Sequence, residues 1–342
     1  MRLLRDAAWL LRLGFAAWLV PAGLNHFVGL FPQPPGNQPI SQEVLAALIG
    51  SGLFALVKAV ELAAGLALIF GRFVPLALVM LLPVSFNVWY WDVQLQGWTS
   101  VSAWYGWAVL GANVLLCLAW WPSYRAMLAW RGGGTEPTVR QLWPLRLMLG
   151  LSLLLGGLNA LAGPWWPLPT GSTPHAVQLL TALQHSGLLA VAFGILLVAG
   201  ALLVAGLFVP LALAAALAVN VGALFWAMWL DLHLLWGPAA LLVVVMNTML
   251  MLAWLPAYLP MLQPRPLAVG ETPVDRYEDL FANPRGGLDK SRWALGAVLL
   301  ALACAFYWLM LPPILGTWNM VFLIIPAAVL LAKLPQKAPT PI

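Results

Sequence analysis

The chain is a succession of long apolar runs separated by short polar stretches. Cutting it at charges, prolines and polar clusters gives ten runs: 8–30, 44–70, 73–91, 102–121, 145–163, 177–205, 207–230, 235–255, 293–311 and 318–333. Most of them reach the ~20 residues that a helix needs to cross a bilayer. The pattern therefore predicts an all-α integral membrane protein with ten transmembrane helices, the last run being the shortest.

Composition supports this class. Hydrophobic residues make up 63% of the chain and charged residues 8%, and the mean hydropathy is +0.91, whereas soluble domains carry about 25% charged residues. The lipid bilayer is thus the first expected partner. The net charge of +5 is accounted for by membrane topology and by attraction to anionic lipid, and nothing indicates nucleic-acid binding.

Lys and Arg lie on one side of the predicted membrane. All of them except Lys58 fall at the N-terminal ends of odd-numbered runs or the C-terminal ends of even-numbered runs. Because cytoplasmic loops retain positive charge, we expect both termini in the cytoplasm. A cleaved signal peptide is the alternative for residues 1–30. Arg12 interrupts that run and no A-x-A site follows it, so we expect the segment to be retained.

The sequence also contains an internal repeat with a spacing of about 134 residues. "GLN" at 23–25 recurs at 157–159, "SGL" at 51–53 recurs at 186–188, and "GRFVPLAL" at 71–78 recurs as "GLFVPLAL" at 206–213. Each unit holds four runs, and because four is even, we expect two parallel repeats. The predicted organisation is a four-helix unit at 1–130, a second, degenerate unit at 140–260, a cytoplasmic linker at 261–292, and two C-terminal helices with a short tail at 293–342.

A charged pair interrupts the second run. The stretch "ALVKAVELAAG", residues 55–65, places Lys58 and Glu61 three positions apart, although an ionisable side chain at membrane depth costs at least a few kcal/mol. The second repeat has apolar residues at these positions and at that of His26: Phe193, Leu196 and Ala160. Charges that occur in only one copy are hard to explain as part of the fold that the two copies share. Residues kept in both copies, such as Gly52 and Gly187, are expected to serve packing and turns.

Other polar residues are expected near this pair. If residues 44–70 form one helix that enters the membrane at Glu43, Lys58 lies roughly 22 Å along it, near mid-membrane. Asp92 is expected at the outer surface. We predict a funnel with Glu61 and His26 as proton-handling residues, lined by a set of ligand-binding residues: Lys58, Asn87, Asp92, Tyr105 and Asn113.

Structural alternatives stay open for each of these residues. Lys58 and Glu61 can satisfy each other on one helix face without any ligand. Asn87 and Asn113 can act as interhelical hydrogen-bonding residues, and His26 can be a solvated side chain near the interface.

No metal or prosthetic-group motif is recognisable in the sequence. His175, His185 and His233 have no partner at a spacing of four residues, and both cysteines, Cys117 and Cys304, lie within predicted helices. We therefore expect no metal site, haem or flavin.

The pattern S-G-x(5)-K-x-x-E-x-x-x-G-x(5)-G, followed by "FVPLAL" and preceded by a helix ending in "GLNHF", resembles the DoxX/DoxD-like family of four-helix bacterial membrane proteins. Lys58, Glu61, Gly65 and Gly71 match the second-helix motif of that family. The resemblance covers residues 8–125 well and 145–258 more weakly. It implies quinone-linked redox work in a bacterial inner (cytoplasmic) membrane, with quinone as the expected cofactor and a protein partner that carries out the redox chemistry.

Three functions follow as hypotheses. The first is a non-autonomous membrane subunit of a quinone-linked redox system, which binds a quinone or similar lipophilic molecule in the first four-helix unit. The second is a structural or assembly subunit of a larger membrane complex. The third is a small-solute transporter, although the loss of the charges from the second unit disfavours a symmetrical transport pathway.

Overall fold

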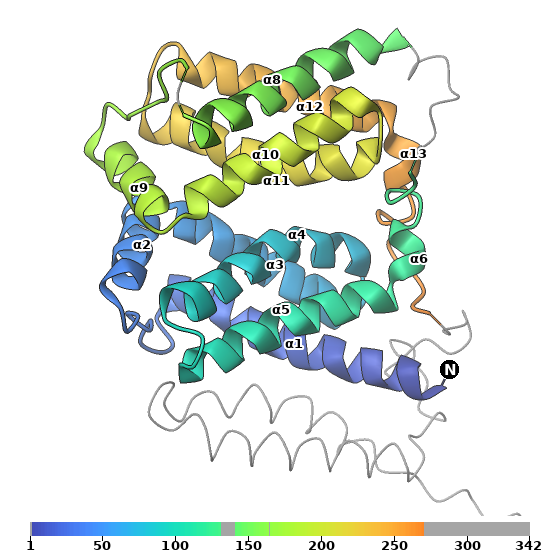
Figure 1. Cartoon of the computed structure of the whole chain (residues 1–342). Helices are drawn as coiled ribbons and strands as arrows, with labels where there is room; N and C mark the ends of the chain where they lie inside the picture. Colours follow the sequence, from blue (N-terminus) through green and yellow to red (C-terminus); the bar gives the residue numbers. More distant parts are fainter. Residues whose placement is uncertain (1, 131–140, 164, 270–342) are drawn as a thin grey trace, which may run out of the picture. The chain divides into compact units, whose positions relative to one another are not determined.

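The structure is a computed structural model that describes residues 2–130, 141–163 and 165–269 (Figure 1). Throughout this part of the chain the regular elements are helices. The two predicted C-terminal helices, Cys304 and most of the predicted linker lie outside it.

The helices in the first half of the sequence are α1 (Arg2–Val28), α2 (Pro39–Gly50), α3 (Leu53–Phe70), α4 (Val74–Trp89), the π-helical turn η1 (Tyr90–Leu95), α5 (Val101–Ala119) and α6 (Trp121–Tyr124). They are followed by α8 (Trp143–Leu161), α9 (Pro174–His185), α10 (Leu188–Ala205), α11 (Val209–Phe225), the π-helical turn η2 (Trp226–Leu230), α12 (Trp236–Ala253) and α13 (Leu255–Tyr258). From α1 to α6 and from α8 to α13, the elements follow one another in the same order.

Eight segments of the described chain are long and apolar enough to cross a membrane. They are α1 from Ala7 onward, α3, α4 with η1, α5, α8, α10, α11 with η2, and α12. Each lies within or overlaps one of the first eight predicted apolar runs. The chain is therefore a multi-pass helical membrane protein.

Two predicted runs are each divided into two helices. The run 44–70 holds α2 and α3, and the run 177–205 holds α9 and α10, with breaks at Ser51–Gly52 and Ser186–Gly187. Gly52 and Gly187 have φ angles of 78° and 80°, a conformation that glycine adopts at no steric cost. The prediction of one continuous helix over 44–70 is therefore wrong. Lys58 lies five residues after Leu53, the first residue of α3, which is only ~7.5 Å along that helix.

The chain forms two compact units that are not contiguous in sequence. Of the described residues, the first comprises 2–34, 55–122 and 263–269, and the second comprises 35–54, 123–130, 141–163 and 165–262. Helix α2 consequently belongs to the second unit, where it packs against α9. There the exposed His185 Nδ1 lies 3.0 Å from Glu43 Oε1, a surface pair of the kind that adds little to stability.

In the first unit, glycines allow α1 and α3 to approach closely. A Cβ atom on Gly65 would lie 2.9 Å from the Val20 side chain, and one on Gly23 would lie 2.9 Å from the Lys58 carbonyl oxygen. Small residues have this role at membrane helix interfaces because they let backbones come together. Helix α5 packs against both α4 and α1, and this arrangement surrounds the outer part of α3 with polar and aromatic side chains, described below.

The second unit repeats these contacts. A Cβ atom on Gly157 of α8 would lie 2.9 Å from the Phe193 carbonyl oxygen, which matches the position of Gly23 against Lys58. Leucines that are 0% exposed occur 134 or 135 positions apart in the two units: Leu68 and Leu203, Leu78 and Leu213, and Leu116 and Leu250. The two units thus use the same packing positions.

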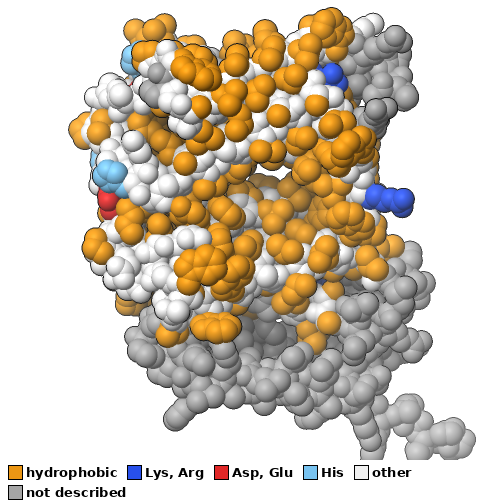
Figure 2. Space-filling model, viewed as in Figure 1, with side chains coloured by type: hydrophobic (Ala, Val, Ile, Leu, Met, Phe, Trp, Pro, Cys, Tyr) orange, Lys and Arg blue, Asp and Glu red, His pale blue; other side chains and the backbone are white. Residues whose placement is uncertain are grey.

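The outward sides of the helices are apolar. Hydrophobic side chains are spread over the whole described face in Figure 2. Large exposed ones come from the spanning helices of both units: Leu56, Phe70, Leu115, Leu118, Val198 and Leu252. A soluble monomer rarely exposes so much contiguous apolar surface, and lipid contact accounts for it.

Candidate functional site

The charged pair of α3 is buried and mutually bonded. Lys58 Nζ donates a hydrogen bond of 2.7 Å to Glu61 Oε2, and the side chains are 12% and 1% exposed. The i,i+3 spacing puts both side chains on one face of the helix. An ion pair at this depth is costly unless its members also make other favourable interactions.

Helix α1 lies directly against the backbone that carries this pair. The contact centres on Gly23, where a Cβ atom would come within 2.9 Å of both the Lys58 carbonyl oxygen and the Leu62 nitrogen. Trp18 lies about one and a half turns earlier on α1. Its ring meets that of Tyr105 edge-on, with centroids 5.5 Å apart and an interplanar angle of 73°.

Tyr105 of α5 connects the pair to a second carboxylate. Its hydroxyl accepts a hydrogen bond from the Trp18 indole N–H, and it interacts electrostatically with both Glu61 and Asp92. Four elements therefore contribute to one polar cluster, which we define as Trp18 of α1, Lys58 and Glu61 of α3, Asp92 of η1 and Tyr105 of α5.

Asp92 is buried within the protein, although it lies only three residues from the end of η1, and its place at the outer surface of the membrane stays a prediction. Helix α4 continues into the π-helical turn η1, and this turn directs Asp92 inward, so that the residue is 3% exposed. Gln96 Nε2 donates to its Oδ1 at 3.1 Å, whereas its Oδ2 has no hydrogen-bond partner. Gly106 makes room for it, because a Cβ atom there would lie 2.8 Å from Asp92 Cβ. π-Helical turns of this kind are frequent at functional sites.

Two serines connect η1 to the start of α5. The hydroxyl groups of Ser100 and Ser102 lie 2.9 Å apart and contact the Asp92 carbonyl oxygen at 3.5 and 3.4 Å. Ser100 also caps α5 by accepting from the Ala103 N–H at 3.2 Å. These serines, Gln96 and Trp18 are not among the residues predicted from the sequence. The S-x-S spacing at the beginning of a predicted helix was a signal for the serines.

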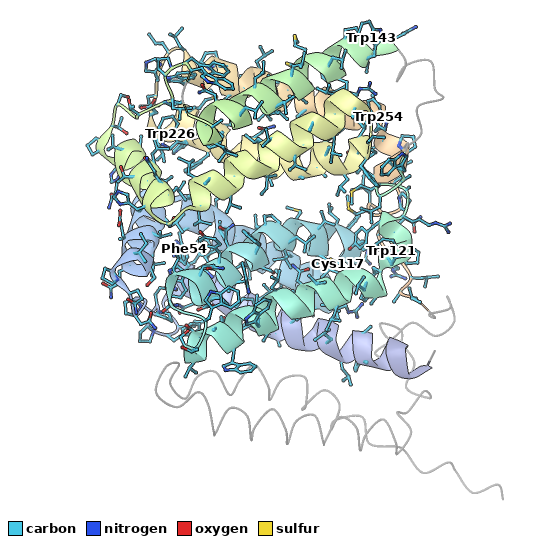
Figure 3. The ribbon with its side chains drawn as sticks, in the orientation of Figure 1. Phe54, Cys117, Trp121, Trp143, Trp226 and Trp254 are labelled. Atoms are coloured by element: carbon cyan, nitrogen blue, oxygen red, sulfur yellow. The ribbon has the colours of Figure 1, made fainter. Side chains whose placement is uncertain are left out.

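Asn113 and Asn87, both predicted ligand-binding residues, lie in other environments. Asn113 is 0% exposed, and its Nδ2 donates to Ser85 Oγ at 2.9 Å. Its Oδ1 accepts from the Sγ of Cys117 at 3.7 Å. Cys117 is labelled on α5 in Figure 3. Asn87 is exposed and donates to the Pro83 carbonyl oxygen of its own helix at 2.8 Å. This geometry favours the alternative of interhelical hydrogen bonding for Asn113.

His26 lies in the last turn of α1. Its ring meets that of Phe27 edge-on, with centroids 5.1 Å apart. The proton-handling role of His26 stays a prediction.

The second unit keeps the polar packing contact but not the cluster. With the Asn247 amide oriented to satisfy its neighbours, its oxygen accepts from Asn220 Nδ2 at 3.1 Å, in the place of the Asn113–Ser85 bond. The cluster residues Trp18, Lys58, Glu61 and Tyr105 correspond to Ser152, Phe193, Leu196 and Ala239.

Asp231, a buried carboxylate of the second unit, is hydrogen-bonded to a neighbouring loop. Asp231 Oδ1 accepts from the Ser172 backbone N–H and from its hydroxyl at 2.7 Å, while Thr173 Oγ1 donates to the Leu230 carbonyl oxygen at 2.6 Å. Nearby, the indole of Trp226, labelled in Figure 3, donates to the Ala176 carbonyl oxygen at 2.9 Å. These bonds fasten the loop before α9 to η2. Asp92 and Asp231 thus differ in how their carboxylates are satisfied.

Within the residues that the structure describes, no group of three or more His, Cys, Asp or Glu side chains could hold a metal ion. Comparison of the chain with protein-family models, with curated proteins and with solved structures finds no match. The residues of the cluster themselves are therefore the basis for a functional proposal.

Proposed function

We propose that this protein is a non-autonomous membrane subunit of a redox system, and that it binds a quinone or a similarly lipophilic molecule at the polar cluster of its first unit. One observation carries the proposal: a Lys–Glu pair, a second buried carboxylate and a tyrosine lie together in one unit, while the matching helices of the other unit have apolar or small residues there. The scaffold alone does not require these charges.

The chemistry of the cluster suits a quinone. A quinone ring carries two carbonyl oxygens, and Lys58 offers a charged hydrogen-bond donor to one of them. Glu61 or His26 accepts or supplies the proton that accompanies oxidation or reduction of the quinone. Because no haem, flavin or iron–sulfur motif is recognisable in the sequence, a partner protein is the proposed source or acceptor of electrons.

The membrane arrangement forms part of the same proposal. We place ten crossings in a bacterial inner membrane, with two parallel four-helix repeats and both termini in the cytoplasm. The one-sided distribution of Lys and Arg supports this orientation, and the shared order of elements supports the repeat.

Direct titration tests the ligand. Purified protein is titrated in detergent with short-chain ubiquinone and menaquinone analogues, and binding is followed by tryptophan fluorescence. The combined change Lys58→Phe and Glu61→Leu, which installs the residues of the second unit, is expected to weaken binding by about tenfold or more. The matched control, Phe193→Leu with Leu196→Met on α10, is expected to bind as the wild type does. Equal affinity in all three proteins, or no binding by the wild type, contradicts the proposal.

A structural or assembly subunit is the second candidate. It is favoured by the 2.7 Å Lys58–Glu61 bond, because a pair that satisfies itself on one helix can serve packing alone. In that case the double replacement leaves both the fold and the partner proteins bound to it unchanged.

A further inference from the structure

The polar residues of the first unit lie at successive depths from one end of its helices. Asp92 is three residues from the end of η1, Tyr105 is four residues into α5, and Glu61 is eight residues into α3. At 1.5 Å per residue these positions lie about 4.5, 6 and 12 Å from the helix ends. Because consecutive spanning helices reverse direction, these three ends lie on the same side of the membrane. The residues therefore form a graded series from that side toward Glu61.

Further observations connect the members of the series. Ser100 and Ser102, both only partly buried, lie at the Asp92 backbone. Asp92 presents a buried carboxylate oxygen, Oδ2, with no hydrogen-bond partner. Tyr105 lies beside Gly106, the residue against which Asp92 Cβ packs, and interacts electrostatically with both carboxylates.

We infer that Asp92 and Tyr105 form a proton path between Glu61 and the aqueous phase at the η1–α5 loop. The inference deepens the proposed function and rests on it for the physiological source of the proton, which is the quinol bound at Lys58 and Glu61. The exchange itself requires no ligand, so it can be measured separately.

The transfer is balanced at every atom. The O–H bond of the protonated Glu61 breaks as its proton moves to the Tyr105 oxygen, and the Tyr105 hydroxyl proton passes to the Asp92 carboxylate. Asp92 then releases its proton to water at the loop, so that Tyr105 and Asp92 return to their starting states and Glu61 is left as a carboxylate, ready to accept the next proton. The other charged group facing Glu61 is Lys58 on its own helix, which stabilises the carboxylate once the proton has gone. Trp18 donates to the Tyr105 oxygen and so fixes the orientation of the phenol.

The second unit offers no such path. The residue at the position of Tyr105 is Ala239, that at the position of Glu61 is Leu196, and Asp231 is bonded to Ser172. Proton exchange is thus an expected property of the first unit.

Time-resolved infrared spectroscopy of the whole protein in liposomes tests the path. The carboxyl band of Glu61 is identified by its loss in Glu61→Gln, and its response to a pH jump is timed without any quinone present. Tyr105→Phe and Asp92→Asn are expected to slow the response by about tenfold or more. Tyr90→Phe, a control on the same turn as Asp92, is expected to leave the rate unchanged. In the wild type, the band is expected to respond when the pH changes on the side of the η1–α5 loop.

Three results would overturn the path: unchanged rates in both variants, an equally fast response to a pH jump on the opposite side, or no titrating Glu61 band. The comparison of pH jumps on the two sides of the membrane uses the wild-type protein alone, so it tests the path even if a variant fails to fold. Slowed exchange in the variants together with no quinone binding would refute the proposed ligand and retain the path. Quinone binding with unaffected exchange would refute the path alone.

Discussion

Lys58 Nζ lies 2.7 Å from Glu61 Oε2 in the first unit, and the corresponding helix of the second unit carries Phe193 and Leu196 at the same positions. The same scaffold position therefore accepts either a buried ion pair or two apolar residues. Replacing the ion pair with the two apolar residues therefore makes it possible to measure how the pair affects function separately from how it affects stability.

Removing one partner of the pair is expected to destabilise the protein. Lys58→Met leaves Glu61 as an uncompensated charge at 1% exposure, and loss of one partner from a buried ion pair costs about 3–5 kcal/mol. The double change Lys58→Phe plus Glu61→Leu is expected to restore most of that stability. Unfolding in sodium dodecyl sulfate, measured by circular dichroism for the single and double variants, gives the coupling between the two residues. Single and double variants that are equally destabilised would contradict this account of the pair.

Gly23→Ala is expected to separate α1 from α3. The new methyl group would lie 2.9 Å from the Lys58 carbonyl oxygen, so the backbones must move apart, at a cost of about 1–3 kcal/mol. Gly14→Ala is the matched control, because it lies on the same helix with nothing within 4 Å of the added Cβ. The free energy of unfolding should fall only in the first variant. Equal effects of the two changes would show that helix propensity, and not close packing, decides.

Replacement of the two buried aspartates is expected to reduce stability by different amounts. Asp231→Ala removes the acceptor of two hydrogen bonds from Ser172 and should cost about 1–3 kcal/mol. Asp92→Asn should cost less than about 1 kcal/mol, because the Asp92 Oδ2 has no partner to lose. The melting temperatures of the two variants in detergent provide the measurement. Greater destabilisation by Asp92→Asn than by Asp231→Ala would mean that Asp92 is mainly structural.

Ser85→Ala tests the role of Asn113. It removes the acceptor of the 2.9 Å bond from Asn113, and polar bonds between membrane helices contribute about 0.6 kcal/mol on average and up to about 1.7. We expect a loss of stability in this range with unchanged quinone affinity. Asn220→Ala should have a similar effect in the second unit, where Asn220 and Asn247 form the equivalent contact. A large loss of quinone affinity in Ser85→Ala, without such a loss in Asn220→Ala, would instead support Asn113 as a ligand-binding residue.

Hydropathy predicted the eight spanning segments of the described residues but could not locate the breaks within two of the predicted runs. The run 44–70 carries no charges apart from Lys58 and Glu61, so no charged boundary separates α2 from α3. Ser51–Gly52 and Ser186–Gly187 were nevertheless visible as a shared dipeptide, and the positive φ of both glycines is the physical reason for the break. The depth assigned to Lys58 changed because the spanning helix begins at Leu53.

The cluster was predicted in part. Lys58, Glu61, Asp92 and Tyr105 were identified because polar residues are rare in this sequence. The inward direction of Asp92 depends on the π-helical turn η1, which shifts the helical phase and has no simple sequence signature. The contribution of Trp18 depends on the packing of α1 against α5, a long-range relationship that single-chain patterns do not encode.

Mass spectrometry of the lipophilic molecules that accompany the protein through mild-detergent purification tests the central claim most directly. Wild-type protein and the double variant Lys58→Phe with Glu61→Leu are purified from the same membranes and compared at equal helical content. A quinone that accompanies the wild type and is absent from the equally folded variant is the predicted result. The same molecules in both preparations, or no quinone with either, would contradict a redox site at Lys58 and Glu61.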